Sequence, residues 1–307
     1  PWWAIGLSVM ATYTSAFTFL GAPAWAYTEG FSVIFIHINY PIAVFIVISV
    51  FIPFFYNSGV ASIFEYLERR FGRTSRLVMS SIFLLGNIIY SGIILYTTAL
   101  VIEFITGTDV VTAITVVSVI AMTYTLLGGI SAVIWTDVAQ TVILLSGAAI
   151  VLFLLIADLP LPLSDTLLSL KAEGRLNPFE FSLAPDKVAT VWTGVIAMSI
   201  YHVVVYGVNQ MMIQRTLVAK TIGDAKKAYI MMGYAAFFIF SVLFSLGIFL
   251  HAFFEGASFD NTNTIMLEFV KLASVPGLMG LIAVAIVAAA MSSLDSSLNS
   301  MATVTNI

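Results

Sequence analysis

The chain has 307 residues, a formal net charge of −4 and no cysteine; 60% of its residues are hydrophobic and only 9% are charged. Soluble domains carry about 25% charged residues, so this composition, with a mean hydropathy of +1.05, excludes a soluble protein and indicates an integral membrane protein. The lack of cysteine excludes disulfides and thiolate metal sites.

Eight stretches are long and apolar enough to cross a bilayer, which takes about 20 residues. In chain order they are residues 3–26, 31–55, 77–105, 109–127, 131–157, 189–213, 228–253 and 275–305. The sequence therefore predicts an all-α polytopic membrane protein.

The first predicted span is not an ordinary apolar helix. Hydroxyl residues crowd around Thr14 and Ser15, and Gly21 and Pro23 follow within a few residues. Hydroxyl side chains compete with helical hydrogen bonds, and a Gly-x-Pro sequence interrupts them. We therefore expect an interrupted helix whose freed carbonyls can ligate a hard cation such as Na⁺. The alternative is a proline-kinked span whose hydroxyls bond back to its own carbonyls.

Positive residues set the orientation. Eight of the 12 Lys and Arg residues lie in two short loops after the second and sixth spans: Arg69, Arg70, Arg73, Arg76, Arg215, Lys220, Lys226 and Lys227. Because positive loops stay in the cytoplasm, loops 56–76 and 214–227 are predicted to be cytoplasmic. Loops 158–188 and 254–274 are then external.

Asp137 lies near the start of the fifth span, where it shares a face with Gln140. One interpretation is interfacial: Asp137 caps the helix and reaches water, beside Trp135 in an interfacial belt. The other is that Asp137 faces inward and completes a cation site with the eighth span.

The eighth span carries a polar stripe. Ser292, Asp295, Ser296 and Asn299 share one helical face by their spacing. A carboxylate at mid-span costs about 2.5–3.5 kcal/mol on insertion scales, so it marks a functional site. No Lys or Arg lies in the central part of any predicted span. We therefore expect no buried basic side chain beside either aspartate, and a bound cation or proton as the partner.

Five segments, in order along the chain, resemble one known family. They are SAFTFLGAPAWAY, EYLERRFG, YTLLGGISAVIWTDVAQ, YGVNQMMIQRTLVAK and AAAMSSLDSSLNSMATV. Together they are similar to the sodium:solute symporter family. The resemblance implies a leucine-transporter-type fold of two inverted five-helix repeats: a first repeat over 1–157, an external loop over 158–188, and the first three helices of the second repeat over 189–307. It also implies a fragment that lacks both ends of the family's chain.

The resemblance further implies sodium sites. The main site would use carbonyls and hydroxyls from the first and eighth spans: Ala11, Thr14, Ala289, Ser292 and Ser293. A second site, present in some members, corresponds here to Asp137, Asp295 and Ser296, with Ser292 shared. Asp295 stands where the two-sodium pattern has a serine, so the charge balance of that site differs from the family's.

Substrate contacts carried over from the family fall at six positions: Tyr13, Ser15, Thr18, His37, Tyr90 and His202. Tyr90 stands where the sialic acid type has an arginine, and Phe17, Thr18 and His202 replace the residues of the sugar type. Two segments, IIYSGIILY and YGVNQ, most resemble the monocarboxylate, multivitamin and iodide branch of the family.

The expected function is sodium-coupled symport of a small polar solute (a sugar, monocarboxylate or vitamin-like compound) across the cell membrane. Na⁺ is the coupling ion; no other cofactor and no nucleic acid is expected. A proton-coupled carrier with Asp295 or Asp137 as the proton site and a sensor module of a signalling protein remain alternatives. An enzyme lacks support, because no nucleophile–base pair, metal cluster or nucleotide loop is present.

Overall fold

The computed structural model describes residues 1–184 and 187–306, so the parts of the predicted external loop and second repeat at positions 185, 186 and 307 lie outside the described residues. Every regular element in the described ranges is helical. The helices are α1 (Trp2–Tyr13), α2 (Ala16–Glu29), η1 (Phe31–His37), α3 (Tyr40–Ile46), η2 (Val47–Phe51), α4 (Ile52–Ser58), α5 (Ile63–Phe71), α6 (Arg73–Thr106), α7 (Val110–Ala157), α8 (Leu163–Ala172), η3 (Thr193–Ala197), α9 (Met198–Val208), α10 (Gln210–Leu217), α11 (Ile222–Phe253), η4 (Thr262–Thr264), α12 (Ile265–Ala273) and α13 (Leu278–Asn306).

The predicted spans appear within a few residues of their expected bounds. In the described part of the chain, five helices are long and apolar enough to cross a membrane, and two bent helix pairs raise the number to as many as seven. The 48-residue α7 contains two predicted spans on either side of a break at Gly129. The expected all-α multi-pass membrane architecture is thus confirmed.

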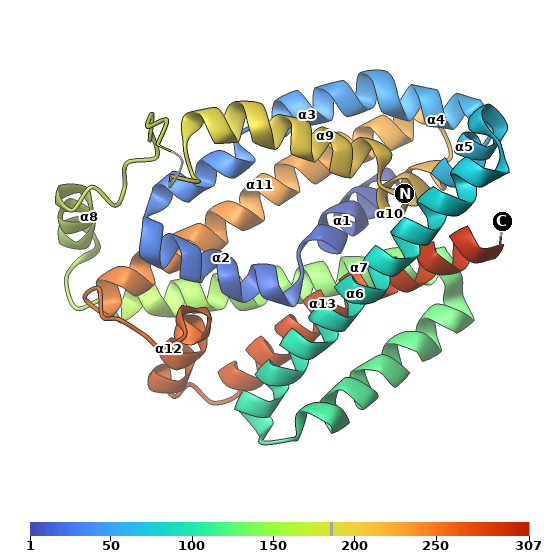
Figure 1. Ribbon diagram of the computed structural model, residues 1–307. Coiled ribbons are helices and arrows are strands. Elements are labelled where there is room, and N and C mark those ends of the chain that lie inside the picture. The colour runs from blue at the N-terminus through green and yellow to red at the C-terminus, as the bar shows by residue number, and fades with distance from the viewer. Residues whose placement is uncertain (185–186, 307) are drawn as a thin grey trace.

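Gly129 is the residue that separates the two halves of α7. Its φ of 55° and ψ of −157° are non-helical values inside an otherwise continuous helix. That backbone region is open almost only to glycine, so Gly129 lets the chain turn sharply between its fourth and fifth spans, as Figure 1 shows at the end of the green segment.

The first span is interrupted, but not where the Gly-x-Pro sequence predicts. α1 ends at Tyr13 and α2 starts at Ala16, with a bend of 67° between them, whereas α2 runs on through Pro23. The hydroxyls explain the position. The Thr14 hydroxyl donates to the Met10 carbonyl (3.3 Å), and the Ser15 hydroxyl accepts from the Thr18 N–H (3.3 Å) to cap α2. We call residues 14 and 15 the break.

Two long helices form the centre of the bundle: α13 packs on α7, α6 and α1, and α11 packs on α1 and α2. The short helices α8 and α12 both lie toward one end of the molecule, and α4 and α5 lie at the opposite end (Figure 1). Polar connections therefore collect at two opposite ends of an apolar bundle, as the orientation prediction requires.

The polar end at α5 is held by local hydrogen bonds. The Ser62 hydroxyl accepts from the Glu65 N–H, and the Glu65 carboxylate accepts from the Ala61 N–H at 2.7 Å. The Ala61 N–H and the Arg69 guanidinium hold the pKa of Glu65 below its ordinary value. These contacts fix the start of a charged helix, with Glu65, Glu68, Arg69 and Arg70, between the second and third spans.

Gly129→Ala places a side chain at a backbone conformation that L-residues avoid. We expect it to lower the free energy of unfolding by about 1–3 kcal/mol, seen as a lower thermal midpoint of the purified protein in detergent. Gly92→Ala is the control. Gly92 lies in helical α6 with open space where a Cβ would stand, so alanine there should stabilise by up to about 1 kcal/mol. Equal stability of Gly129→Ala and wild type would contradict the role of Gly129.

Candidate ion and substrate sites

A small cavity lies beside the break, and we call it the ion cavity. Its volume is about 10 Å³, about the minimum for one water molecule, so only a water-sized or smaller species fits. Four of the five residues expected at the main sodium site line it: Ala11, Thr14, Ala289 and Ser292. The fold thus brings α1 and α13 together where the resemblance implies a sodium ion.

Ser293, the fifth residue of that set, does not line the ion cavity. It is fully buried, and its hydroxyl donates to the Thr12 carbonyl at 3.2 Å and, weakly, to the Ala289 carbonyl at 3.5 Å. Ser293 therefore connects α13 to α1 at Thr12, just before the break.

Gln140 and Thr141 from α7 also line the ion cavity, and the family-based set does not include them. The side-chain oxygens Oε1 of Gln140 and Oγ1 of Thr141 are buried without a hydrogen-bond partner. Buried oxygens usually have a partner, and a hard cation takes oxygen ligands, so both residues are candidates for the ion site. The only signal in the sequence is that Gln140 shares a face with Asp137.

Asp137 faces the interior, which excludes its interfacial interpretation. Its side chain is fully buried. Its carboxylate accepts hydrogen bonds from Ser292 on α13 and from Ser8 on α1, both at 2.5 Å. It therefore links the fifth span to the first and the eighth, as the inward-facing interpretation predicts.

The expectation that no buried Lys or Arg neutralises an aspartate is wrong for Asp137. Arg215, placed by the sequence in a cytoplasmic loop, lies in α10 with no exposed surface and pairs with Asp137 at 3.1 Å. Its guanidinium also donates to Ser8 at 2.7 Å, to Ser296 at 2.5 Å and to the Met211 carbonyl at 2.9 Å. The sixth span is broken at Asn209 with a bend of 52°, and this bend carries α10 into the bundle.

Asp295 does not join Asp137 and Ser296 in a shared cluster. It is fully buried, and its carboxylate accepts hydrogen bonds from the Tyr124 hydroxyl and from Thr125 (3.1 Å), both on the first half of α7. The three residues expected at the second sodium site thus divide between two clusters. Asp137 and Ser296 contact Arg215, whereas Asp295 contacts the segment just before Gly129.

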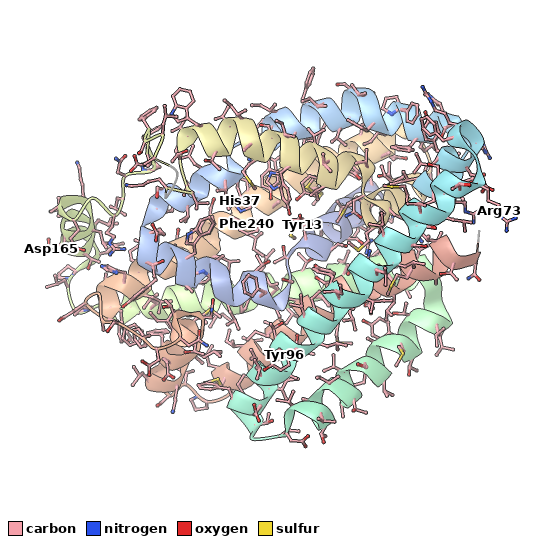
Figure 2. The ribbon with its side chains drawn as sticks, viewed as in Figure 1. Tyr13, His37, Arg73, Tyr96, Asp165 and Phe240 are labelled. Atoms are coloured by element: carbon pink, nitrogen blue, oxygen red, sulfur yellow. The ribbon has the colours of Figure 1, made fainter. Side chains whose placement is uncertain are left out.

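A larger cavity of about 540 Å³ lies on the other side of the break, and we call it the large cavity. It extends from the break to Thr262 and Asn263 in the loop before α12. Four of the six expected substrate contacts line it: Tyr13, Thr18, His37 and His202. Figure 2 shows Tyr13, His37 and Phe240 close together, from three different spans.

The other two expected contacts lie elsewhere: Ser15 caps α2, and Tyr90 lies on α6 outside the lining. The lining includes further residues that sequence reasoning missed. Tyr201 shares a hydrogen bond with Tyr13 through their hydroxyls, and Phe240 stacks on His37 with 3.6 Å between ring centroids. Phe240 comes from the middle of a uniformly apolar span, so its sequence context carries no signal of this role.

These features define a class of protein. A multi-pass helical bundle with two broken helices, a cation-sized cavity at one break and a larger cavity beside it has the arrangement of a secondary transporter of the leucine-transporter type. The sequence pattern of the sodium:solute symporter family matches residues 1–306. The chain belongs to this family.

The relatives are sodium-coupled transporters rather than enzymes. The sodium-coupled monocarboxylate transporter 2 of Danio rerio is 30% identical over 308 residues, which cover 98% of this chain and 49% of the relative. The sodium/iodide cotransporter of Homo sapiens is 30% identical over 309 residues, covering 98% and 48%. The chain therefore spans about half the length of the curated relatives it matches.

A solved structure confirms the fold. The substrate-bound, outward-open state of a Na⁺-coupled sialic acid symporter superposes with a TM-score of 0.90 at 32% identity. The match covers 100% of this chain and 66% of that one. The leucine-transporter-type fold expected from the resemblance is confirmed.

The Asp137–Arg215 pair predicts strong thermodynamic coupling. Removing one member of a buried ion pair leaves an uncompensated charge and costs about 3–5 kcal/mol. We expect Asp137→Asn and Arg215→Gln each to destabilise by this order, and the double variant to cost at least 1 kcal/mol less than their sum, roughly the coupling seen between contacting residues. Unfolding midpoints of the four proteins in detergent measure it.

The exposed pair Arg69–Glu65 serves as the control for that cycle. Its arginine side chain is 54% exposed, so Arg69→Gln should change stability by less than about 1 kcal/mol. Additive effects of Asp137→Asn and Arg215→Gln would show that the buried pair makes no energetic contribution as a pair.

Proposed function

We propose that the protein is a sodium-coupled symporter that carries a small organic monocarboxylate across the cell membrane. The single observation that carries the proposal is the ion cavity. It brings Ala11, Thr14, Ala289 and Ser292 around a water-sized space beside a broken helix. Membership of the sodium:solute symporter family supports sodium as the ion.

In this proposal Na⁺ stabilises the arrangement of the break. α1 ends at Tyr13, where the Ala11 carbonyl accepts from the Thr14 N–H at 3.0 Å and the Thr12 carbonyl accepts from the Ser293 hydroxyl of α13 at 3.2 Å. An ion bound between α1 and α13 holds these two helices together and so orders Tyr13 and Thr18 beside the large cavity. Substrate binding and sodium binding are coupled because both depend on the geometry of residues 10–18.

The energy for transport comes from the sodium gradient. Moving one net charge across 100 mV is worth about 2.3 kcal/mol. Because one Na⁺ together with one monocarboxylate anion carries no net charge, the concentration gradient of Na⁺ rather than the membrane potential drives this cycle. We propose that the large cavity opens to the outside, that loops 56–76 and 214–227 are cytoplasmic, and that 158–188 and 254–274 are external. The division into repeats over 1–157 and 189–307 belongs to the same proposal, supported by a broken helix at the start of each.

The monocarboxylate is proposed from the relatives and the cavity together. The Danio rerio relative is a sodium-coupled monocarboxylate transporter. The large cavity offers hydrogen-bonding groups at its inner end, from His37 and His202, and aromatic rings along its wall. This combination suits a short apolar chain that carries a polar head group.

Ser292→Ala with Ser293→Ala tests the main site. The variant removes two hydroxyl oxygens that would coordinate the ion, so we expect the Na⁺ concentration for half-maximal uptake in proteoliposomes to rise roughly 10-fold or more, which corresponds to about 1.4 kcal/mol or more of binding free energy. Ser297→Ala is the matched control on the same helix, because its hydroxyl bonds to Asn87 at 3.1 Å and Ser91 at 2.9 Å, away from the ion cavity. Unchanged sodium dependence in the double variant would overturn the assignment of the main site.

The second sodium site expected from the resemblance, at Asp137, Asp295 and Ser296, is a separate question from the main site. In the described geometry Arg215 already neutralises Asp137 and binds Ser296, so a second ion would have to displace the guanidinium. We therefore expect one sodium per cycle, and a Hill coefficient close to one for Na⁺-dependent uptake at saturating substrate. A coefficient near two would show that Arg215 leaves Asp137 during the cycle.

A further inference from the structure

Positive charge is concentrated where α5 ends and α6 begins, and we call this part of the molecule the arginine corner. Within eight residues it contains Arg69, Arg70, Arg73 and Arg76. Two of these arginines are neutralised locally: Arg69 pairs with Glu65, and Arg76 pairs with Glu68, both at 2.5 Å. Arg70 and Arg73 have no carboxylate partner among the described residues. The corner therefore carries two uncompensated positive charges.

The arginine corner is a firm support for these charges rather than a loose loop. Phe64 of α5 packs against Phe83 of α6, with 5.2 Å between the ring centroids. The guanidinium of Arg70 donates to the Tyr66 hydroxyl at 2.9 Å and lies 5.4 Å from the centre of the Phe71 ring. A side chain that is already held in place loses less freedom when it binds a ligand. The corner is thus preorganised for binding.

Arg73 lies at the depth of the lipid headgroups. Leu77 is one helical turn further along the same face of α6, and it is exposed within the apolar span. Four residues of helix measure about 6 Å, and the headgroup region on each side of a bilayer is about 5–8 Å thick. Figure 2 shows Arg73 at one end of the molecule, directed away from the bundle. Its charge is therefore at the level of lipid phosphates.

Apolar side chains lie next to the two free arginines. Phe71 is 63% exposed, and Leu77 and Val78 are exposed at the start of the span. We infer that the arginine corner binds an anionic phospholipid. Arg70 and Arg73 contact its phosphate, and the three apolar side chains contact its acyl chains. The planar fork of N–H donors on a guanidinium matches phosphate oxygens.

The position of the corner favours a lipid over other anions. A free phosphate has no apolar part to place against Phe71 and Leu77, and an acidic protein segment would have to enter the headgroup layer to reach Arg73. Basic side chains next to a span attract anionic lipids in this layer. The inference is independent of the ion and the solute that are transported.

The test measures the thermal midpoint of the full-length protein in detergent during titration with three compounds. Phosphatidylglycerol carries a net negative charge, phosphatidylcholine has the same acyl chains and phosphate but no net charge, and glycerol phosphate has the anion without the chains. A ligand that binds the folded state raises the midpoint. We expect half of the maximal rise at a phosphatidylglycerol concentration roughly 10-fold or more below that of either other compound.

A double variant, Arg70→Gln with Arg73→Gln, identifies the binding residues. One basic side chain near an anionic surface contributes a factor of about five in affinity. We therefore expect this variant to need roughly 30-fold more phosphatidylglycerol than wild type for half of the maximal rise. No ion pair among the described residues involves either arginine, so the midpoint without lipid should stay close to the wild-type value.

Lys226→Gln with Lys227→Gln is the matched control. It removes the same two charges from the other basic segment, at the start of α11, and should leave the affinity for phosphatidylglycerol unchanged. An equal loss of affinity in the arginine and lysine variants would overturn the inference, because it would show a general attraction of anionic lipid to basic segments.

Two further outcomes would also overturn the inference. Equal half-saturating concentrations of phosphatidylglycerol and phosphatidylcholine would show that the charge of the headgroup is not recognised. A glycerol phosphate concentration as low as that of phosphatidylglycerol would show that the arginine corner binds a soluble phosphate rather than a lipid.

Discussion

The requirement that backbone polar groups inside a membrane find partners shapes the whole molecule. A helix meets it along its length, so any break at membrane depth must be compensated by protein, water or ligand. At Thr14 and Ser15 the chain breaks its first helix and compensates with hydroxyls from Thr14, Ser15 and Ser293. The ion cavity lies on one side of this break and the large cavity on the other. One local interruption therefore positions both sites and gives a physical route for their coupling.

Charge balance in the interior follows a second rule, that buried charges are paired. Arg215 and Asp137 neutralise each other and gather serines from α1 and α13 around them. The result is a polar cluster that joins α1, α7, α10 and α13. Its charges are balanced without a sodium ion. Asp295 is treated differently: its partners are neutral hydroxyls of Tyr124 and Thr125, beside the Gly129 turn. The two aspartates of the interior, Asp137 and Asp295, thus have different electrostatic surroundings.

The sequence predicted the secondary structure well, because the length of an apolar segment is a property of neighbouring residues. Apolar length located the spans, including the pair within α7 that meets at Gly129. The break of the first span was expected from the hydroxyl cluster and from the Gly-x-Pro sequence together, and it occurs at the hydroxyl cluster, at Thr14 and Ser15. Pro23 lies inside α2, and its carbonyl packs closely against Gly247 of α11, more than 200 residues away in the chain. The break occurs instead where hydroxyls can satisfy the freed groups.

Hydropathy is a property of single segments, so it was enough to predict the membrane class and the eight spans, whereas the residues expected at the ion site came from the resemblance to a family. Which charges meet depends instead on how the helices are placed in three dimensions. Arg215 looked like one of four basic loop residues, and nothing in its neighbourhood distinguished it from Lys220. The bend at Asn209 turns α10 inward and buries Arg215 against Asp137, a pairing that depends on the position of one helix end relative to another. His202 likewise contacts Asn39, at 2.6 Å between Nδ1 and Oδ1, only because folding brings together residues that are 163 positions apart in the chain.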